Sequence, residues 1–349
     1  MNLALGAMTM LISYTALSGQ TAAPSQDAYL KSREYQASLG KLKFRKDSTF
    51  HIVQFTDIHW NNSRPDLMLP VRKCMECVLD AEHPDLVILT GDIFTGTPNR
   101  AVVDSVLAPI IGRKLQWAVT FGNHDDEQDM TREQLYEYLS TLPGNLTSTV
   151  KGISGVTNYI LPVTGNGSDR IASAIYVFDS HAYSAAEATK GYDWIKRDQI
   201  RWYESCSRSL TQANGGKPLP ALAFFHIPLP EYNYAAQDEK SLLIGTRKEK
   251  SCAPVVNSGL FTALLDVGDV MATFVGHDHV NDYLTLYKGI VLGYGRFTGG
   301  NTTYHDIPGG NGARVIILKE GKRDFRTYVR LRSGKVKDDL RLVGDLIMP

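Results

Sequence analysis

Buried strands that alternate with helices dominate the sequence from Phe50 onward. Continuous apolar runs at 50–56, 86–90 and 117–121 predict strands, and the stretches between them, at 66–81 and 101–111, predict helices. Strands that are apolar on both faces and alternate with helices are typical of a mostly parallel sheet covered on both sides. We therefore expect an α/β protein in which ligands gather beyond the carboxyl ends of the strands.

The second half of the sequence follows the same logic with shorter elements. We expect a helix at 132–140, a hairpin across 158–179, a helical stretch at 191–210, a strand at 222–225, a helix at 258–266, and strands at 270–275, 283–287, 290–294 and 314–318. The last three strands are expected to complete a second sheet. No internal repeat or low-complexity linker interrupts the pattern.

The two ends of the chain differ from this central domain. Residues 1–24 resemble a secretory signal, because the stretch from Leu3 to Leu17 is apolar, small residues follow it, and it is short for a membrane span. We therefore expect an exported protein, periplasmic or secreted, with no membrane span in the mature chain; a buried or disordered N-terminal segment is the alternative. Residues 25–47 form a polar lead-in, 48–331 the folded domain, and 332–349 a charged, peripheral tail.

Charge and cysteine usage narrow the function class. Lys plus Arg and Asp plus Glu both number 37, and no polybasic run is present, which disfavours a dedicated nucleic-acid binder. Four cysteines fit few or no disulfides, and Cys74 continues a helical apolar stripe, which favours a core position over a redox pair with Cys77. The sequence gives no indication of the oligomeric state.

Polar motifs stand just beyond five of the expected strands. Two metal ions about 3.5 Å apart require a bridging carboxylate, several ligands of mixed charge and open positions for water and substrate. Asp92 is the natural bridge, and Gly122 and Gly276 allow close backbone approach. The full set of candidate metal ligands is Asp57, His59, Asp92, Asn123, His226, His277 and His279.

Two residues follow the candidate ligand Asn123 directly. If the two metal ions bind a phosphate ester, a histidine that follows a ligand without binding metal itself would lie near the phosphate group. His124 is therefore expected to protonate the oxygen that leaves the phosphorus or to stabilise the transition-state charge. Asp125 is expected to keep His124 cationic. Both residues are therefore candidate catalytic groups.

Other polar and aromatic residues near the strand ends carry weaker signals. Arg296, in a Gly-rich run, is a candidate for binding substrate phosphate through its planar guanidinium, with a solvated loop position as the alternative. Asp278 is interpreted as a supporting residue. Trp60, Tyr183 and Tyr232 are interpreted as packing residues, with walls of the pocket that stack on a substrate as the alternative. His51, His83, His181 and His305 are interpreted as surface or satisfied core residues.

Taken together, the motifs resemble those of the calcineurin-like metallophosphoesterase superfamily. The family pattern of Asp-x-His, Gly-Asp, Gly-Asn-His-Asp, a lone His and Gly-His-x-His is matched in order across residues 48–320. The resemblance implies a four-layer α/β/β/α sandwich with two mixed sheets packed face to face. It also implies that Asp57, His59, Asp92 and His279 hold one metal ion and that Asp92, Asn123, His226 and His277 hold the other.

The sequence is similar to the purple-acid-phosphatase-like branch, with one departure. Members of that branch with a purple colour carry a tyrosine ligand three residues after the bridging aspartate, where this chain has Thr95. The ferric colour is therefore not expected, and manganese, zinc or iron all fit the remaining ligands.

The resemblance implies an exported phosphoesterase with two metal ions. The resemblance further implies that a small phosphate ester would be hydrolysed by in-line attack of a metal-bridging hydroxide, and phosphomonoesters are the expected substrates. A phosphodiesterase, acting on a nucleotide or phospholipid-type diester, and a non-catalytic metal-binding protein are the alternatives. The insert at 145–179 is the expected source of substrate selectivity.

Overall fold

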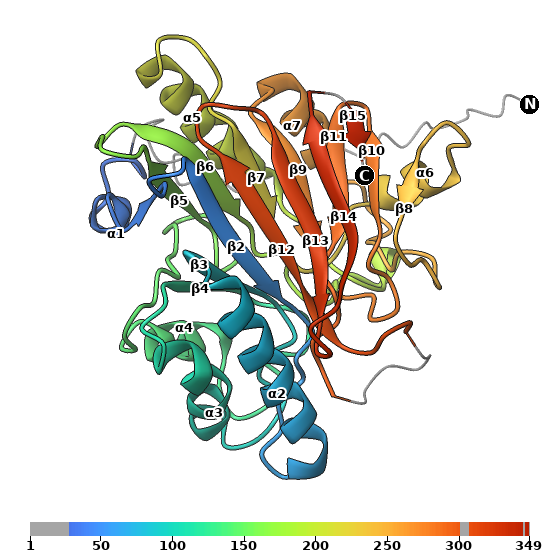
Figure 1. Ribbon diagram of the computed structural model, residues 1–349. Coiled ribbons are helices and arrows are strands. Elements are labelled where there is room, and N and C mark those ends of the chain that lie inside the picture. Colours follow the sequence, from blue (N-terminus) through green and yellow to red (C-terminus); the bar gives the residue numbers. More distant parts are fainter. Residues whose placement is uncertain (1–27, 301–306, 345, 349) are drawn as a thin grey trace, which may run out of the picture.

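The computed structural model describes residues 28–300, 307–344 and 346–348. Two β-sheets lie face to face at the centre of the described chain, and helices lie outside them (Figure 1). The expected secretory signal and His305 fall outside the described residues. Within the described part, none of the helices combines the length and the apolar composition needed to cross a bilayer.

The first sheet has seven strands and combines a parallel half with an antiparallel half. Its order is β15 (Leu346–Met348), β14 (Val336–Val343), β13 (Phe325–Leu331), β12 (Gly312–Lys319), β2 (Thr49–Phe55), β3 (Leu86–Thr90) and β4 (Trp117–Thr120). The strands β2, β3 and β4 run parallel to one another, and β12 to β15 add an antiparallel ribbon to β2. The parallel half is the one expected from the alternating pattern.

The second sheet has eight strands and is also mixed. Its order is β1 (Leu42–Lys43), β5 (Tyr159–Thr164), β6 (Ile171–Val177), β7 (Ala221–Phe224), β9 (Val270–Val275), β11 (Ile290–Tyr294), β10 (Leu284–Tyr287) and β8 (Leu243–Ile244). Its central strands β6, β7, β9 and β11 are parallel. Parallel strands in both sheets therefore place several carboxyl ends at one end of the sandwich.

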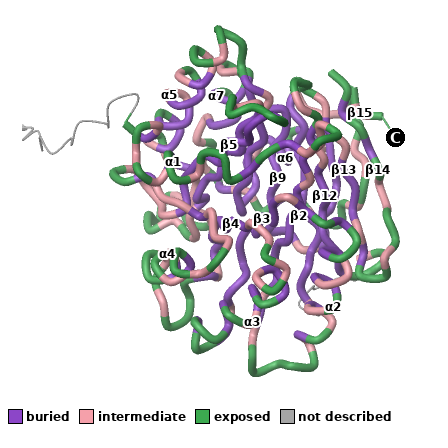
Figure 2. Tube along the Cα trace, turned by 60° about the vertical axis from the view of Figure 1, so that its left-hand side comes forward, coloured by how far each residue is buried: buried purple, intermediate pink, exposed green. Residues whose placement is uncertain are grey.

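Helices cover the outer faces of both sheets. They are α1 (Arg33–Ser38), α2 (Pro65–Glu82), α3 (Asn99–Ile111), α4 (Arg132–Leu139), α5 (Arg197–Ala213), α6 (Glu231–Gln237), α7 (Leu260–Val267) and the short 3-10 helix η1 (Glu187–Thr189). In Figure 1, α2, α3 and α4 gather on one side of the molecule and α5 and α7 on the opposite side. Most strands are buried between the helices and loops, whereas β14 and β15, at one edge of the first sheet, are largely exposed (Figure 2). This is the four-layer α/β/β/α architecture that the resemblance implied.

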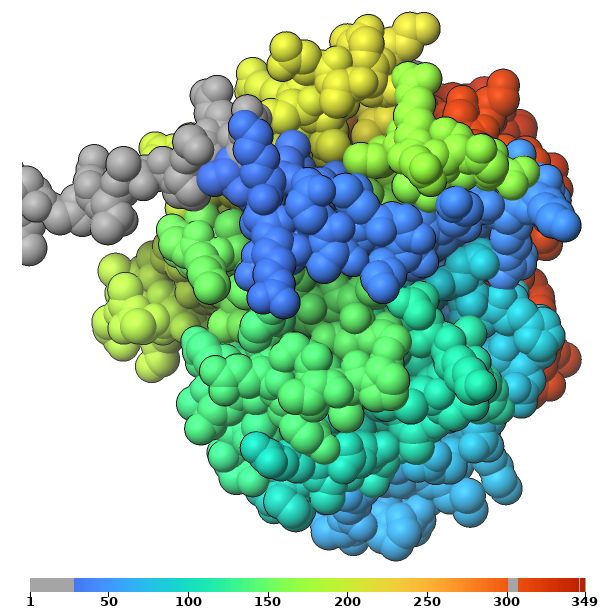
Figure 3. Space-filling view, turned by 90° about the vertical axis from the view of Figure 1, so that its left-hand side faces the viewer, coloured from blue at the N-terminus to red at the C-terminus, as the bar shows by residue number. Residues whose placement is uncertain are grey.

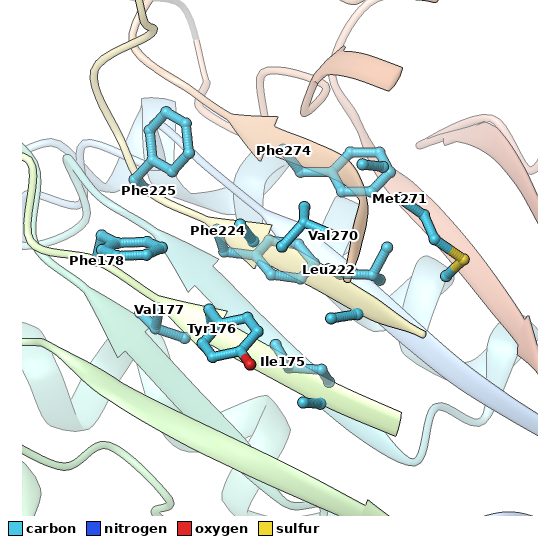
Figure 4. Packing of buried hydrophobic residues seen from close by; sticks show 14 of the residues in the cluster. Ile175, Tyr176, Val177, Phe178, Leu222, Phe224, Phe225, Val270, Met271 and Phe274 are labelled. Atoms are coloured by element: carbon cyan, nitrogen blue, oxygen red, sulfur yellow. The ribbon is translucent and has the colours of Figure 1, made fainter. Parts of the chain in front are cut away.

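Aromatic and branched side chains fill the space around the second sheet. Phe224 and Phe274, on neighbouring strands, stack with ring centroids 5.5 Å apart (Figure 4). Phe178 packs edge-on against Tyr203 of α5. Continuous apolar strands are buried on both faces, because one face packs against the other sheet and the opposite face against helices. The core thereby fixes the strand ends to which the polar motifs are attached.

One expected strand lies in a different sheet from the one predicted. The strand at 314–318 was expected to complete the second sheet, but β12 pairs antiparallel with β2, with Val315 opposite Val53. Without β12, β2 would be an edge strand with a row of unpaired backbone groups, and pairing satisfies them. Apolar periodicity identifies a strand but does not indicate its partner.

Both ends of the domain extend further than the composition suggested. Tyr29 and Tyr35 of the polar lead-in are buried in the core, and this segment lies across the surface between later parts of the chain (Figure 3). Beyond residue 331, Leu340 and Leu342 point inward from β14, so the expected tail forms two strands of the first sheet. A few apolar side chains at alternate positions suffice to anchor a segment that is polar on average.

Candidate metal centre

Seven side chains from five strand ends meet at one end of the sandwich. Asp57 and His59 follow β2, Asp92 follows β3, and Asn123 follows β4, all in the first sheet. His226 follows β7, and His277 and His279 follow β9, in the second sheet. All seven residues predicted as metal ligands are therefore brought together where the two sheets meet.

The first group of ligands contains Asp57, His59, Asp92 and His279. One ligand atom from each of these side chains lies within 4.8 Å of the others. The Nε2 atoms of His59 and His279 are 3.1 Å apart, and His279 Nε2 is 3.5 Å from a carboxylate oxygen of Asp57. The group combines two carboxylates with two imidazoles.

The second group shares Asp92 with the first. His226 Nε2 lies 3.2 Å from Asp92 Oδ2, 3.2 Å from Asn123 Oδ1 and 3.3 Å from His277 Nδ1. The same Oδ2 atom of Asp92 is 3.8 Å from His59 Nε2 in the first group. Asp92 therefore stands between two sets of ligand atoms, as a bridging carboxylate must.

The spacing of these atoms fits metal binding. Two ligands that bind one ion at about 2.1 Å and at a right angle to each other are roughly 3 Å apart. Nitrogen atoms with lone pairs that face each other at such distances repel unless a proton or a cation lies between them. Imidazole with carboxylate and carboxamide oxygens is a donor set suited to manganese, iron or zinc, so the residues fit two metal ions.

Burial and neighbouring charges set the protonation of the histidines. Burial lowers the pKa of His59 to about 4 and that of His277 to about 3, so both rings are neutral at neutral pH, as metal binding requires. Burial also lowers the pKa of His226, but the adjacent Asp92 carboxylate outweighs burial and raises it to about 9. A metal ion therefore competes with a proton at His226.

Hydrogen bonds outside the two groups orient the ligands. The backbone carbonyl of Thr90 lies 2.8 Å from His226 Nδ1, which directs Nε2 toward Asp92. Thr56 Oγ1 donates a hydrogen bond of 2.8 Å to Asp57, and the backbone N–H of His277 donates to the same carboxylate at 3.0 Å. The ligands are thus held in place by the protein itself.

Four of the seven residues adopt left-handed backbone conformations. The φ angle is 53° at Asp57, 48° at His59, 54° at Asp92 and 77° at His277. Residues other than glycine avoid this region because their Cβ crowds the backbone, and such strain is concentrated at functional sites. Sharp turns at the strand exits therefore aim the side chains into the centre.

Two glycines make room for the ligands, as expected from the sequence. A Cβ atom at Gly122 would lie 2.2 Å from Asp92 Oδ1, and one at Gly276 would lie 2.7 Å from Asp57 Oδ2. Both distances are far shorter than a van der Waals contact. Any larger residue at either position would displace a metal ligand.

His124 lies at the edge of the centre. Its ring centroid is 5.7 Å from that of His59, and its side chain is 37% exposed, so it faces both the ligands and solvent. Its Nδ1 atom lies 2.7 Å from Glu127 Oε2. Glu127 was not among the residues predicted from the sequence, although its spacing of three residues from His124 was a usable signal.

Asp125 does not contact His124 in the manner predicted. Its buried carboxylate accepts backbone N–H groups of Asp92, Ile93, Phe94 and Gly122 at 2.7 to 3.0 Å. These bonds tie the turn after β3 to the turn after β4. Neighbouring side chains in an irregular turn point in different directions, so adjacency in sequence misled the prediction, and Asp125 is a structural residue.

Arg296 does not reach the metal centre as a phosphate-binding residue would. The side chain is 1% exposed and its guanidinium pairs with Asp282. It also donates to the backbone carbonyls of Gly310, at 3.0 Å, and Pro308, at 2.8 Å. Arg296 is therefore neither a substrate ligand nor a solvated loop residue; it closes the loop between β11 and β12.

The remaining predictions have mixed outcomes. Trp60 and Tyr232 are buried packing residues, as expected, and Asp278 is a supporting residue that accepts a hydrogen bond of 2.6 Å from Tyr294. Tyr183, also interpreted as packing, is instead half exposed and contacts Asn123. The four cysteines, all within the described residues, form no disulfide with one another, and Cys74 is buried in the core as predicted.

Comparisons with known proteins agree with the fold and identify the family. The family model for calcineurin-like phosphoesterases matches residues 50–281. Among solved structures, the chain superimposes on a dimetal phosphatase from Danio rerio with a TM-score of 0.58 and 13% identity, covering 84% of this chain and 99% of that one. A purple acid phosphatase from yellow lupin superimposes with a TM-score of 0.51 and 13% identity over 85% of this chain and 54% of that one.

Two sequence relatives match most of the chain. "Probable inactive purple acid phosphatase 29" of Arabidopsis thaliana is 34% identical, covering 86% of each protein. "Phosphatase DCR2" of Saccharomyces cerevisiae is 36% identical, covering 88% of this chain and 59% of that protein. With this family match and these relatives, the chain belongs to the calcineurin-like phosphoesterase family.

Proposed function

We propose that the protein is a hydrolase of small phosphomonoesters that uses two metal ions. The observation that carries the proposal is the position of Asp92, whose Oδ2 atom lies between a ligand group with His59 and a ligand group with His226. When bound, the two ions would lower the pKa of water and neutralise charge on the phosphate oxygens. The relatives named as phosphatases support this substrate class.

The side chains divide the work in this proposal. Asp57, His59, Asp92 and His279 would hold one ion, and Asp92, Asn123, His226 and His277 would hold the other. His124 faces the position where an ester oxygen leaves, and either donates a proton to that oxygen or stabilises its charge. Glu127 fixes the orientation of the His124 ring through Nδ1, so the other nitrogen of the ring is available to the substrate.

A second function is favoured by one observation: some relatives carry names that describe them as probable inactive enzymes. A non-catalytic metal-binding protein would keep the ligands and lack turnover. This chain retains all seven ligand residues and His124 in one site, which supports hydrolysis over that alternative.

Reconstitution separates the candidate functions. The purified protein is stripped with a chelator, loaded with manganese, zinc or iron, analysed for metal content, and assayed with p-nitrophenyl phosphate and bis(p-nitrophenyl) phosphate. We expect hydrolysis of the monoester that requires two ions per chain. Preferential cleavage of the bis ester would indicate a phosphodiesterase, and two bound ions without cleavage of either ester would reject the enzyme.

We also propose export to the periplasm or the medium, from the apolar stretch at 3–17. Cell fractionation with N-terminal sequencing of the mature protein tests this, and a retained first segment in the cytosolic fraction would contradict it. The balanced charge favours a small-molecule phosphate ester as the partner rather than nucleic acid.

A further inference from the structure

A hairpin between β6 and α5 stands beside the second ligand group. It closes where Tyr183 and Tyr192 form an isolated antiparallel bridge, with hydrogen bonds of 2.9 Å from Ser184 N to Gly191 O and 3.0 Å from Asp193 N to Ala182 O. The short helix η1 lies at its tip. We call residues 182–193 the tyrosine hairpin, because its closing pair brings two tyrosine rings to the metal centre.

The first tyrosine holds a metal ligand. Asn123 Nδ2 donates a hydrogen bond to Tyr183 Oη at 3.1 Å, while Asn123 Oδ1 lies 3.2 Å from His226 Nε2. An amide has one oxygen and one nitrogen, and a metal ion requires the oxygen. By accepting from the nitrogen, Tyr183 selects the amide orientation that turns the oxygen toward the ion.

The second tyrosine holds another ligand and supports the first. Tyr192 packs edge-on against His277, with ring centroids 4.3 Å apart and planes at 90°. Its ring also stacks on Tyr183 at 5.6 Å with an interplanar angle of 25°. A continuous aromatic contact therefore runs from His277 through Tyr192 to Tyr183.

Part of the Tyr183 ring is open to solvent and can contact a ligand. Tyr183 is 49% exposed, although its hydroxyl is fixed at Asn123 and its ring stacks on Tyr192. An uncharged, rigid ring that starts at a metal ligand and extends into solvent suits a flat apolar group.

We propose that the tyrosine hairpin is the wall that selects substrates: Tyr183 positions Asn123 and stacks on an aromatic group carried by the phosphate ester. This inference rests on the proposed function and narrows it to aryl phosphomonoesters. Tyr183 contacts Asn123, the residue that precedes His124 in the turn after β4, so we place the ring on the side from which His124 approaches the leaving group. The wall therefore contacts the part of the ester that differs between substrates.

Binding of non-hydrolysable phosphonates tests stacking without turnover. Calorimetry compares phenylphosphonate with methylphosphonate on the protein loaded with manganese. We expect the wild type to bind the phenyl compound about fivefold more tightly, Tyr183→Phe to keep that preference, and Tyr183→Leu to lose it. Tyr234→Leu is the matched control, because Tyr234 is 50% exposed and belongs to α6 rather than to the hairpin.

Manganese binding tests the positioning role separately. Removing the Tyr183 hydroxyl frees the Asn123 amide, so Tyr183→Phe and Tyr183→Leu should both weaken the second Mn²⁺ site about tenfold, with Tyr234→Leu unchanged. An unaltered Mn²⁺ affinity in both variants would overturn the positioning role.

The stacking role and the proposed function fail in different ways. Equal affinity for the two phosphonates, no binding of either, or a phenyl preference that survives in Tyr183→Leu would overturn the stacking role. If the wild type prefers phenylphosphonate but hydrolyses no ester, the proposed function is refuted and the stacking role of Tyr183 is retained.

Discussion

The Nδ1 atom of His124 lies 2.7 Å from the Oε2 atom of Glu127, on the exposed side of a centre whose other histidines are buried or nearly so. A carboxylate that accepts from Nδ1 fixes the orientation of the ring and leaves Nε2 to face the substrate. The pair is therefore arranged for contact with a substrate, whereas the remaining histidines are arranged for contact with metal.

Replacing His124 should impair turnover without removing metal. We expect His124→Gln to lower kcat for phenyl phosphate by about 100-fold or more while two ions stay bound. Glu127→Ala should give a smaller loss, about tenfold, with Glu133→Ala, on the exposed side of α4, as the control. Steady-state kinetics with metal analysis measures both, and a parallel loss of metal would assign His124 to the ligands instead.

Replacing Asp92 should affect both ions together. Asp92→Asn removes the shared negative charge, so we expect fewer than two ions per chain and at least a 100-fold loss of activity. The control variant Asp104→Asn makes the same change in charge at an exposed position on α3. It should retain two bound ions and the activity. Elemental analysis after gel filtration is the measurement, and a variant that still binds two ions with normal activity would show that Asp92 is not the bridge.

Asp125 should behave as a structural residue. Its carboxylate accepts four backbone N–H groups, and an amide at this position would turn its own N–H₂ toward some of them. We expect Asp125→Asn to lower the free energy of unfolding by about 2 kcal/mol or more. Urea unfolding of the metal-free protein measures this, and normal stability with a selective loss of kcat would restore the catalytic role.

Arg296 should contribute to stability rather than to substrate affinity. Arg296→Met leaves Asp282 buried with less compensating charge, which should cost about 3 kcal/mol. Arg332→Met, at an exposed position, should have little effect. If KM rises for Arg296→Met while the urea midpoint stays constant, the guanidinium contacts substrate after all.

Acid should weaken the link between α4 and the end of β6. Burial raises the pKa of Asp179, but Arg132, 2.8 Å away, and backbone N–H groups outweigh burial and lower it. A carboxyl whose folded pKa is below the unfolded value of about 3.9 stabilises the fold above that value, and the contribution is lost as pH falls through the folded pKa. Asp179→Asn should therefore be less stable than wild type at pH 7. As the pH falls below about 4, the variant should lose less stability than the wild type does. Urea unfolding at a series of pH values measures this. If the unfolding free energies of the wild type and of Asp179→Asn fall in parallel with pH across this range, the prediction is contradicted.

The metal ligands were predictable from the sequence because their geometry follows from parallel strands. The side chains after β2, β3 and β4 must meet at one sheet edge, and His226 and His277 follow parallel strands of the second sheet. Strand ends are fixed by apolar periodicity, which the sequence displays directly.

The errors concern side-chain direction and long-range pairing. Asp125 and Arg296 have suitable chemistry, but irregular turns direct both into the protein. The partner of β12 depends on which strand edge is left open, and the contact between Tyr183 and Asn123 depends on a loop separated by 60 residues. Neither has a periodic signal in the sequence.

The hydrogen bond from the backbone of His277 to Asp57 joins residues 220 positions apart. During synthesis the strands β2, β3 and β4 emerge long before β9. The carboxylates Asp57 and Asp92 therefore cannot meet His277 and His279 until residue 279 has left the ribosome. Completion of the metal centre therefore marks a late step of biogenesis, and a truncated product that ends before β9 lacks two of the three histidines contributed by the second sheet.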